Sequence, residues 1–118
     1  MNLKNLGIPN ERCWKMWASG LSYQRVVDAL AKEGVYNKAT GKPFSSSAAQ
    51  KAAMNHMLHN LEQSKKEFSY RQSVRGQVVT DEEWQGYVAQ MTKLFFCGRP
   101  NAMRKYIAQH GIQHYFKA

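Results

Sequence analysis

The sequence of 118 residues is poor in acidic side chains. Asp and Glu together number 8, against 17 Lys and Arg, so the formal net charge is +9. An excess of one sign in so short a chain destabilises the compact state by self-repulsion unless a polyanion offsets it. Nucleic acid is therefore the first class of partner to consider.

Cysteines and long apolar runs are also scarce. Cys13 and Cys97 lack the spacing of a secreted disulfide framework and fit a reducing compartment. The longest apolar run, at 94–97, is far too short to span a bilayer, and the N-terminus lacks a signal-peptide layout. We expect a cytoplasmic protein with no membrane partner.

Motifs that would support catalysis or metal binding are missing as well. The sequence has no Ser/His/Asp arrangement and no Gly-rich phosphate loop, and the acidic run 81–83 suits the positive end of a helix. Cys97, His110 and His114 have the spacing C-x12-H-x3-H, but no CxxC completes a zinc finger. We therefore expect no catalytic residues, no metal and no cofactor.

Helix signals are frequent in the first half of the chain. An Asn cap at Asn10 predicts a first helix over 11–18, and Gly20 ends it. Ser22 caps a second helix that runs through Glu33. The turn-forming residues that follow predict a loop or a small hairpin over 35–44.

A third helix is predicted after the triple serine 45–47, which offers an N-cap, and it extends to about Leu61. On its helical wheel, Met57 falls on an apolar side, while Lys51 and Asn55 fall on the opposite, polar side. One side of this helix is therefore expected to pack, and the other to remain accessible.

The second half begins with a polar, basic stretch, 62–79, for which a linker, a helix extension and two short strands around Gly76 all stay open. Thr80 and Glu83 then form a capping box at the start of the most regular helical pattern in the chain. Pro100 opens a last short helix. The pattern predicts a mostly α-helical fold that ends in a helical pair.

Several short motifs within residues 18–58 match a known kind of segment: Gly20-Leu21-Ser22-Tyr23, Val26-Val27, Leu30, Gly34-Val35 and Gly41-Lys42-Pro43-Phe44-Ser45. With them the stretch resembles the helix-turn-helix of the DNA-binding regions of serine recombinases and of many phage and mobile-element regulators. The resemblance implies a recognition helix at 46–59. The chain has no room for the recombinase catalytic domain, and it differs from the family in the small side chains of Ala49, Ala52 and Ala53.

A looser similarity, to DNA-binding regions of phage homing endonucleases and to repressors of phage satellites, comes from the second, basic half. Taken together, these likenesses predict a helix-turn-helix part with or without a wing. The expected parts are a DNA-binding part at 1–61, a basic linker or wing at 62–79 and a C-terminal helical part at 80–118.

The candidate contacts follow from the chemistry of DNA. A helix fits the major groove, where short polar side chains reach base edges, while nearby cations neutralise phosphates and set affinity and register. The residues expected to read bases are Ser46, Ser47, Gln50, Lys51 and Asn55. Those expected to contact phosphates are Arg25, Lys38, Lys42, Lys65, Lys66, Arg71 and Arg75.

The function we expect is sequence-specific binding of double-stranded DNA, by a transcriptional repressor of phage or mobile-element origin that acts in the bacterial cytoplasm. One alternative is a DNA packaging or recombination accessory factor that resembles a small terminase subunit. A second alternative is a small nuclease, because such sites can be sparse in sequence.

A homodimer is expected from the aromatic content of the C-terminal part, which exceeds what two short helices easily cover. These side chains are Trp84, Tyr87, Phe95, Phe96, Tyr106, Tyr115 and Phe116. A two-fold dimer would bury them and place two recognition helices about 34 Å apart on successive major grooves. The alternative is that they close a single core with Trp14 and Trp17.

Overall fold

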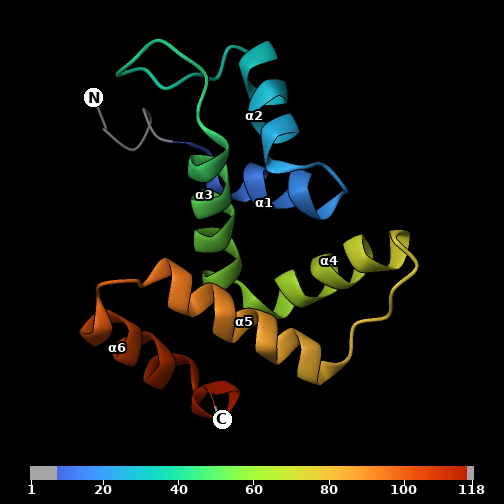
Figure 1. The fold of residues 1–118 in the computed structure, drawn as a ribbon, viewed down its shortest axis with the longest axis vertical. Helices are drawn as coiled ribbons and strands as arrows, with labels where there is room; N and C mark the ends of the chain where they lie inside the picture. Colours follow the sequence, from blue (N-terminus) through green and yellow to red (C-terminus); the bar gives the residue numbers. More distant parts are fainter. Residues whose placement is uncertain (1–7, 117–118) are drawn as a thin grey trace. The chain divides into compact units, whose positions relative to one another are not determined.

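The computed structural model describes residues 8–116, and the chain divides into two compact units between Gln77 and Val78. The helices of the first unit, drawn in blue to yellow-green in Figure 1, are α1 (Asn10–Ala18), α2 (Tyr23–Lys32), α3 (Ser46–His59) and α4 (Leu61–Val74). Those of the second unit are α5 (Asp81–Phe95), α6 (Pro100–His110) and the short 3-10 helix η2 (Gln113–Phe116).

The predicted α-helical class is confirmed. Between residues 8 and 116 there is no strand, and the only bridge is an isolated antiparallel one between Asn37 and Lys42. A wing built from the stretch 62–79 is therefore wrong, because most of that stretch forms α4. The hydrogen bonds of its polar backbone are made within the helix, which needs no partner strand.

Helix starts follow the sequence signals with one exception. The hydroxyls of Ser22 and Ser45 accept hydrogen bonds from the backbone N–H three residues later, at 3.2 and 3.1 Å. The Asn cap predicted for the first helix is wrong, since Pro9 stands at the N-cap and Asn10 already belongs to α1. α1 begins without a side-chain cap, so its position depends on packing.

The core of the first unit forms where α1 crosses α3 (Figure 1), and α2 packs against both. Trp14 of α1 and Leu30 of α2 are fully buried, and so are Ala49 and Ala53 of α3. Small side chains let two helix backbones approach closely, so the alanines of α3 suit its packing against α1.

α3 is shorter than predicted, because it ends at His59 and not near Leu61. The break falls at Asn60, whose backbone leaves the helical region and whose side-chain amide donates to the carbonyl of His56 at 2.9 Å. An Asn side chain competes in this way with the backbone donors that would continue the helix. The chain restarts at Leu61 as α4.

The second unit begins with the predicted capping box, which the structure confirms. The backbone N–H of Glu83 donates to the Thr80 hydroxyl at 3.1 Å, and the backbone N–H of Thr80 donates to the Glu83 carboxylate at 3.2 Å. At the other end of α5, the Arg99 guanidinium donates to the carbonyl of Phe95 at 2.8 Å. Both ends of this helix are thus satisfied by local side chains.

The helices of the described part of the chain are short or polar compared with a membrane span. No helix within residues 8–116 is both long and apolar enough to cross a bilayer. The first seven residues, on which the expected absence of a signal peptide also depends, lie outside the described residues.

Candidate nucleic-acid interface

The accessible side of α3 carries three of the five residues predicted to read bases. Ser47 and Lys51 are exposed and Asn55 is half-buried, and successive spacings of four residues align them along the helix. On the other side, Ala53 and Met57 are buried. Ser47, Lys51 and Asn55, called the α3 strip from here on, therefore offer a hydroxyl, an ammonium and an amide to a partner.

Ser46 and Gln50 are exposed too, but they lie elsewhere on α3. Each residue of an α-helix is turned by about 100° from the one before it, so Gln50 stands well away from its neighbour Lys51. Gln50 is nevertheless a neighbour of Ser47, three residues before it, so Ser46 and Gln50 border the N-terminal end of the α3 strip.

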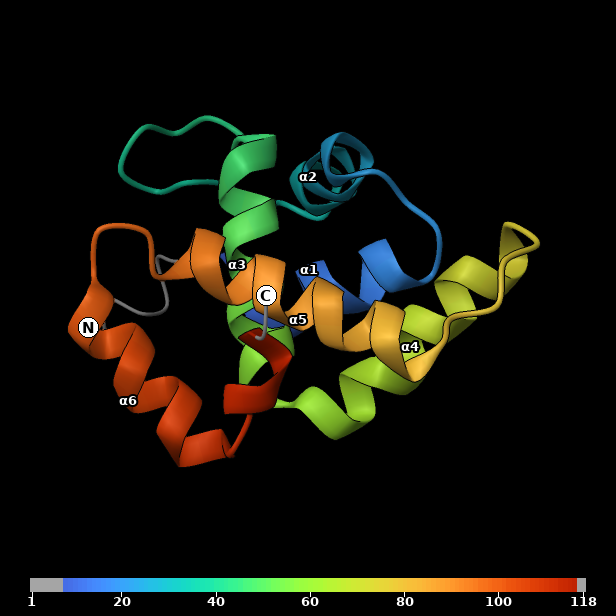
Figure 2. The ribbon, with the colours of Figure 1, turned by 60° about the horizontal axis from the view of Figure 1, so that its bottom comes forward.

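Two of the predicted phosphate contacts, Lys38 and Lys42, are exposed on the loop 35–44. In Figures 1 and 2 this loop projects beyond the N-terminal end of α3. Tyr36, to which the sequence analysis assigned no contact, is 42% exposed on the same loop. An aromatic beside two lysines was visible in the sequence, but its exposure was not.

The other predicted phosphate contacts lie apart from that loop. Arg25 is exposed on α2, while Lys66 and Arg75 are exposed and Lys65 is half-buried on α4 or just after it. α4 starts at the C-terminal end of α3 and runs away from the loop 35–44 (Figure 1). The predicted cations therefore do not form a single cluster.

Arg71 has a role inside the first unit. Its guanidinium donates to the backbone carbonyl of Trp17 and, at 3.2 Å, to that of Leu21. It also lies over the Trp17 ring, 4.0 Å from the centroid. These contacts attach α4 to the turn between α1 and α2, so the structure uses the Arg71 charge within the protein.

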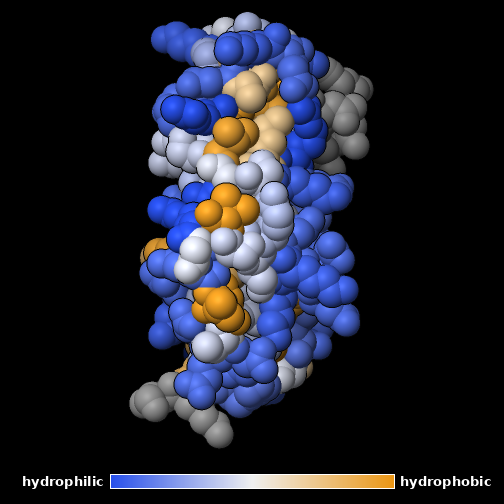
Figure 3. Space-filling view, turned by 90° about the vertical axis from the view of Figure 1, so that its right-hand side faces the viewer, coloured by the Kyte–Doolittle hydropathy of each residue, from blue (hydrophilic) through white to orange (hydrophobic). Residues whose placement is uncertain are grey.

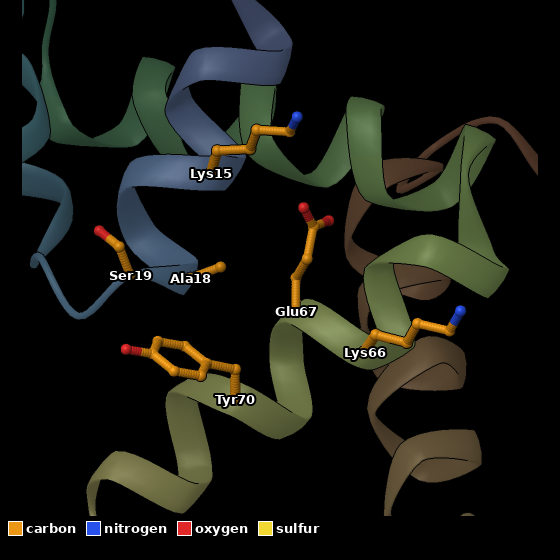
Figure 4. Close-up of a pocket in the computed structure, with 6 residues that line it drawn as sticks. All are labelled: Lys15, Ala18, Ser19, Lys66, Glu67 and Tyr70. Atoms are coloured by element: carbon orange, nitrogen blue, oxygen red, sulfur yellow. The ribbon is translucent and has the colours of Figure 1, made fainter.

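A hollow of about 300 Å³ lies between α1 and α4 (Figure 4). Its lining residues are Lys15, Ala18, Ser19, Lys66, Glu67 and Tyr70. The Glu67 carboxylate accepts a hydrogen bond from the Trp14 indole at 2.9 Å, and the Lys15 ammonium is 3.0 Å from the Glu11 carboxylate. Two of the charged side chains beside this hollow, Lys15 and Glu67, are therefore already engaged within the protein.

Nucleophilic and metal-binding side chains are the remaining groups with possible chemistry. Burial raises the pKa of the Cys13 thiol to about 11, so this sulfur stays protonated and is a poor nucleophile. Among residues 8–116, no three side chains of His, Cys, Asp or Glu gather as a metal site would require.

The aromatic side chains of the second unit contact one another and nearby cations. The Phe96 ring lies 5.3 Å from that of Tyr106, and the Arg99 guanidinium lies over both Phe95 and Phe96. In the described part of this unit, the large hydrophobic side chains that are exposed are Val78 and Leu94, and neither is aromatic. Trp84 and Tyr106 are buried, and the other aromatic side chains named for the dimer are half-buried: Tyr87, Phe95, Phe96, Tyr115 and Phe116.

Comparisons with protein-family models, with curated proteins and with solved structures find no match for this chain. Hydrophilic side chains cover most of the face drawn in Figure 3, and hydrophobic side chains appear along its middle.

Proposed function

We propose that this protein binds double-stranded DNA sequence-specifically, with α3 as the recognition helix in the major groove. The observation that carries the proposal is the α3 strip, where Lys51 and Asn55 stand side by side on the accessible face of a helix. Lysine donates to guanine acceptors, and asparagine pairs with adenine through two hydrogen bonds. These side chains can bind base edges. We propose that this binding serves transcriptional repression in a phage or mobile element.

α3 is a better recognition helix than α2 because of its charges. The accessible side of α2 includes Asp28, which accepts a hydrogen bond from Gln24 at 3.1 Å, and Glu33 follows directly after the helix. A carboxylate facing DNA meets repulsion from the phosphates. α3 has no acidic residue at all.

In this proposal α1, α2 and α3 are the three helices of a helix-turn-helix domain of unusual spacing. The tight turn, at 19–22, joins α1 to α2, whereas α2 and α3 are joined by the longer segment 33–45. Typical helix-turn-helix pairs have only three or four residues before the recognition helix. Despite the longer connection, α3 packs against α1 and α2, and this packing fixes the direction of α3.

The test is selection of duplexes from a random pool, followed by binding measurements with Lys51→Ala/Asn55→Ala. We expect this variant to lose at least about tenfold in the ratio of selected to random affinity, since one bidentate contact gives about 1–3 kcal/mol of discrimination. Its stability should stay within about 0.5 kcal/mol of the wild type, because both side chains lie on the accessible face.

Asn101→Ala/Lys105→Ala is the matched control, because it removes the same two side-chain types, also four residues apart, from exposed positions of α6. It should keep the wild-type ratio. Equal ratios for the two variants would refute α3 as the recognition helix, and a wild type with no selected sequence would refute specific binding.

The assembly on DNA distinguishes the biological roles. A two-fold dimer remains our proposal, because a single recognition helix reads few base pairs, and a dimer doubles the site. Sedimentation with and without the selected duplex should give two chains per site. A ring of more copies would favour the packaging role, and a monomer on a single half-site would contradict the dimer.

A further inference from the structure

The loop 35–44 is a hydrogen-bonded hairpin and not an irregular connection. The backbone N–H of Asn37 donates to the carbonyl of Lys42 at 2.9 Å, and the N–H of Gly41 returns to the carbonyl of Asn37 at 2.7 Å. The side-chain carbonyl of Asn37 accepts from the N–H of Ala39 at 3.0 Å. Gly41 has a φ of 70°, a conformation that favours glycine.

The hairpin is joined firmly to the recognition helix. Pro43 restricts the backbone directly after the turn, and Phe44 is buried against the first unit. Ser45 then caps α3. The segment between the hairpin and α3 is therefore short and conformationally restricted, so a DNA duplex that positions one of them also constrains the other.

The hairpin and α3 also share one electrostatic character. From Gly34 to Leu61 the sequence contains no Asp or Glu, while Lys38, Lys42 and Lys51 lie within that span. All three lysines are exposed. This is a continuous stretch of chain along which a phosphate backbone meets cations and no carboxylate.

The tip of the hairpin carries small side chains. Ala39, Thr40 and Gly41 follow one another there, and in the sequence Lys38 and Lys42 stand on either side of them. The minor groove of B-DNA is about 6 Å wide, and its two edges are lined with phosphates. A tip of small side chains between two cations suits the limited width and the charge of this groove.

We propose that the hairpin 35–44 enters the minor groove adjacent to the major groove that α3 occupies, with Lys38 and Lys42 on the flanking phosphates. The inference rests on the proposed DNA binding and adds a second contact to it. α3 then supplies base recognition, while the hairpin supplies affinity and fixes the register of α3 on the duplex.

The experiment is hydroxyl-radical footprinting, which reports access to the minor groove, on a duplex selected from a random pool by the wild-type protein. The wild type should protect a minor-groove segment next to the bases that α3 covers. Lys38→Ala/Lys42→Ala should lose that protection, and the slope of log affinity against log salt should become less steep by about 1.8, or 0.9 for each phosphate contact.

Two further variants separate geometry from charge. Gly41→Val keeps both lysines but places a β-branched residue at a positive φ. It should therefore distort the hairpin and weaken the minor-groove protection without any change in charge. Lys93→Ala/Lys105→Ala removes two charges from the second unit and should leave the protected segment in place. Thermal melting of each variant checks that the fold is retained.

The outcomes distinguish the two proposals. A wild-type footprint that stays unchanged in Lys38→Ala/Lys42→Ala, with the same salt slope, would overturn the hairpin inference and leave DNA binding by α3 intact. If the wild type leaves no footprint on any selected duplex, both proposals fail. Loss of protection in the Lys93→Ala/Lys105→Ala control would also overturn the hairpin inference, because the removal of any two lysines would then abolish the protection.

Discussion

The two units of this protein use their aromatic side chains differently. In the first unit, the Trp17 ring lies within 6.1 Å of the rings of Trp14, Tyr23 and Phe68, which belong to α1, α2 and α4. In the second unit, the pair Trp84 and Tyr87 lies within α5, and Tyr106 and His110 within α6. The first cluster therefore joins helices that are distant in sequence, whereas most of the second connects near neighbours.

This difference teaches which interactions support each unit. The first unit depends more on tertiary packing, because the rings around Trp17 join three of its helices, and two of these, α1 and α4, begin without side-chain caps. The second depends more on local signals, of which the Thr80 and Glu83 capping box is the clearest. Substitutions in the core should thus act most strongly on the first unit, and loss of a cap should act on the second.

The largest expected effect is that of Leu30→Ala in the core of α2. Leu30 is fully buried, and truncating such a leucine costs about 2–5 kcal/mol. Leu94→Ala in α5 is the matched control, since the same truncation at a side chain that is 53% exposed should cost less than about 0.5 kcal/mol. Denaturant unfolding followed by hydrogen exchange measures both losses, and equal losses would contradict the role of buried Leu30 in the core of the first unit.

Arg71→Ala should have the next largest effect, at about 1–3 kcal/mol, because it leaves the carbonyls of Trp17 and Leu21 without their charged donor. Arg75→Ala removes the same side chain one turn later, at an exposed position, and should be nearly neutral. Thermal melting compares the two variants. If Arg75→Ala lowers the stability as much as Arg71→Ala does, the loss comes from the change in net charge and not from the contacts that attach α4.

Thr80→Ala tests the local signals of the second unit. Removal of an N-cap hydroxyl costs about 1 kcal/mol, and here the loss should appear as faster hydrogen exchange in the first turn of α5. Thr80→Ser keeps the hydroxyl and should restore most of the protection. Faster exchange in α1 and α3 with no change in α5 would show that the cap does not act locally.

The smallest expected effect is a dependence on pH from the exposed ion pairs of the first unit. Arg12 donates two hydrogen bonds of 2.7 Å to Glu33 and lowers the pKa of that carboxyl below its usual value of about 4.5. The unfolded chain then binds the proton more readily, so this stabilisation is complete above pH 4.5 and is lost as the pH falls through the lowered pKa. Melting curves of the wild type and of Glu33→Gln should differ at neutral pH and converge in acid, and curves that stay parallel would exclude this pair.

Much of the local structure is determined by the sequence alone. The hydroxyls of Ser22, Ser45 and Thr80 marked the starts of three helices, and Gly34 marked an exit, because capping and positive φ depend on a few neighbouring atoms. The polar side of α3 was also predictable, since the helical period alone assigns Lys51 and Asn55 to one side.

Only the tertiary structure decided how the cations are used. Arg71 and Arg75 are four residues apart in equally basic surroundings, yet Arg71 lies against Trp17 and Arg75 is exposed. The same holds for Lys38 and Lys42, which lie on a hairpin next to the start of α3. A charge has the same sequence signature in either setting, because its partners come from distant segments that only folding brings together.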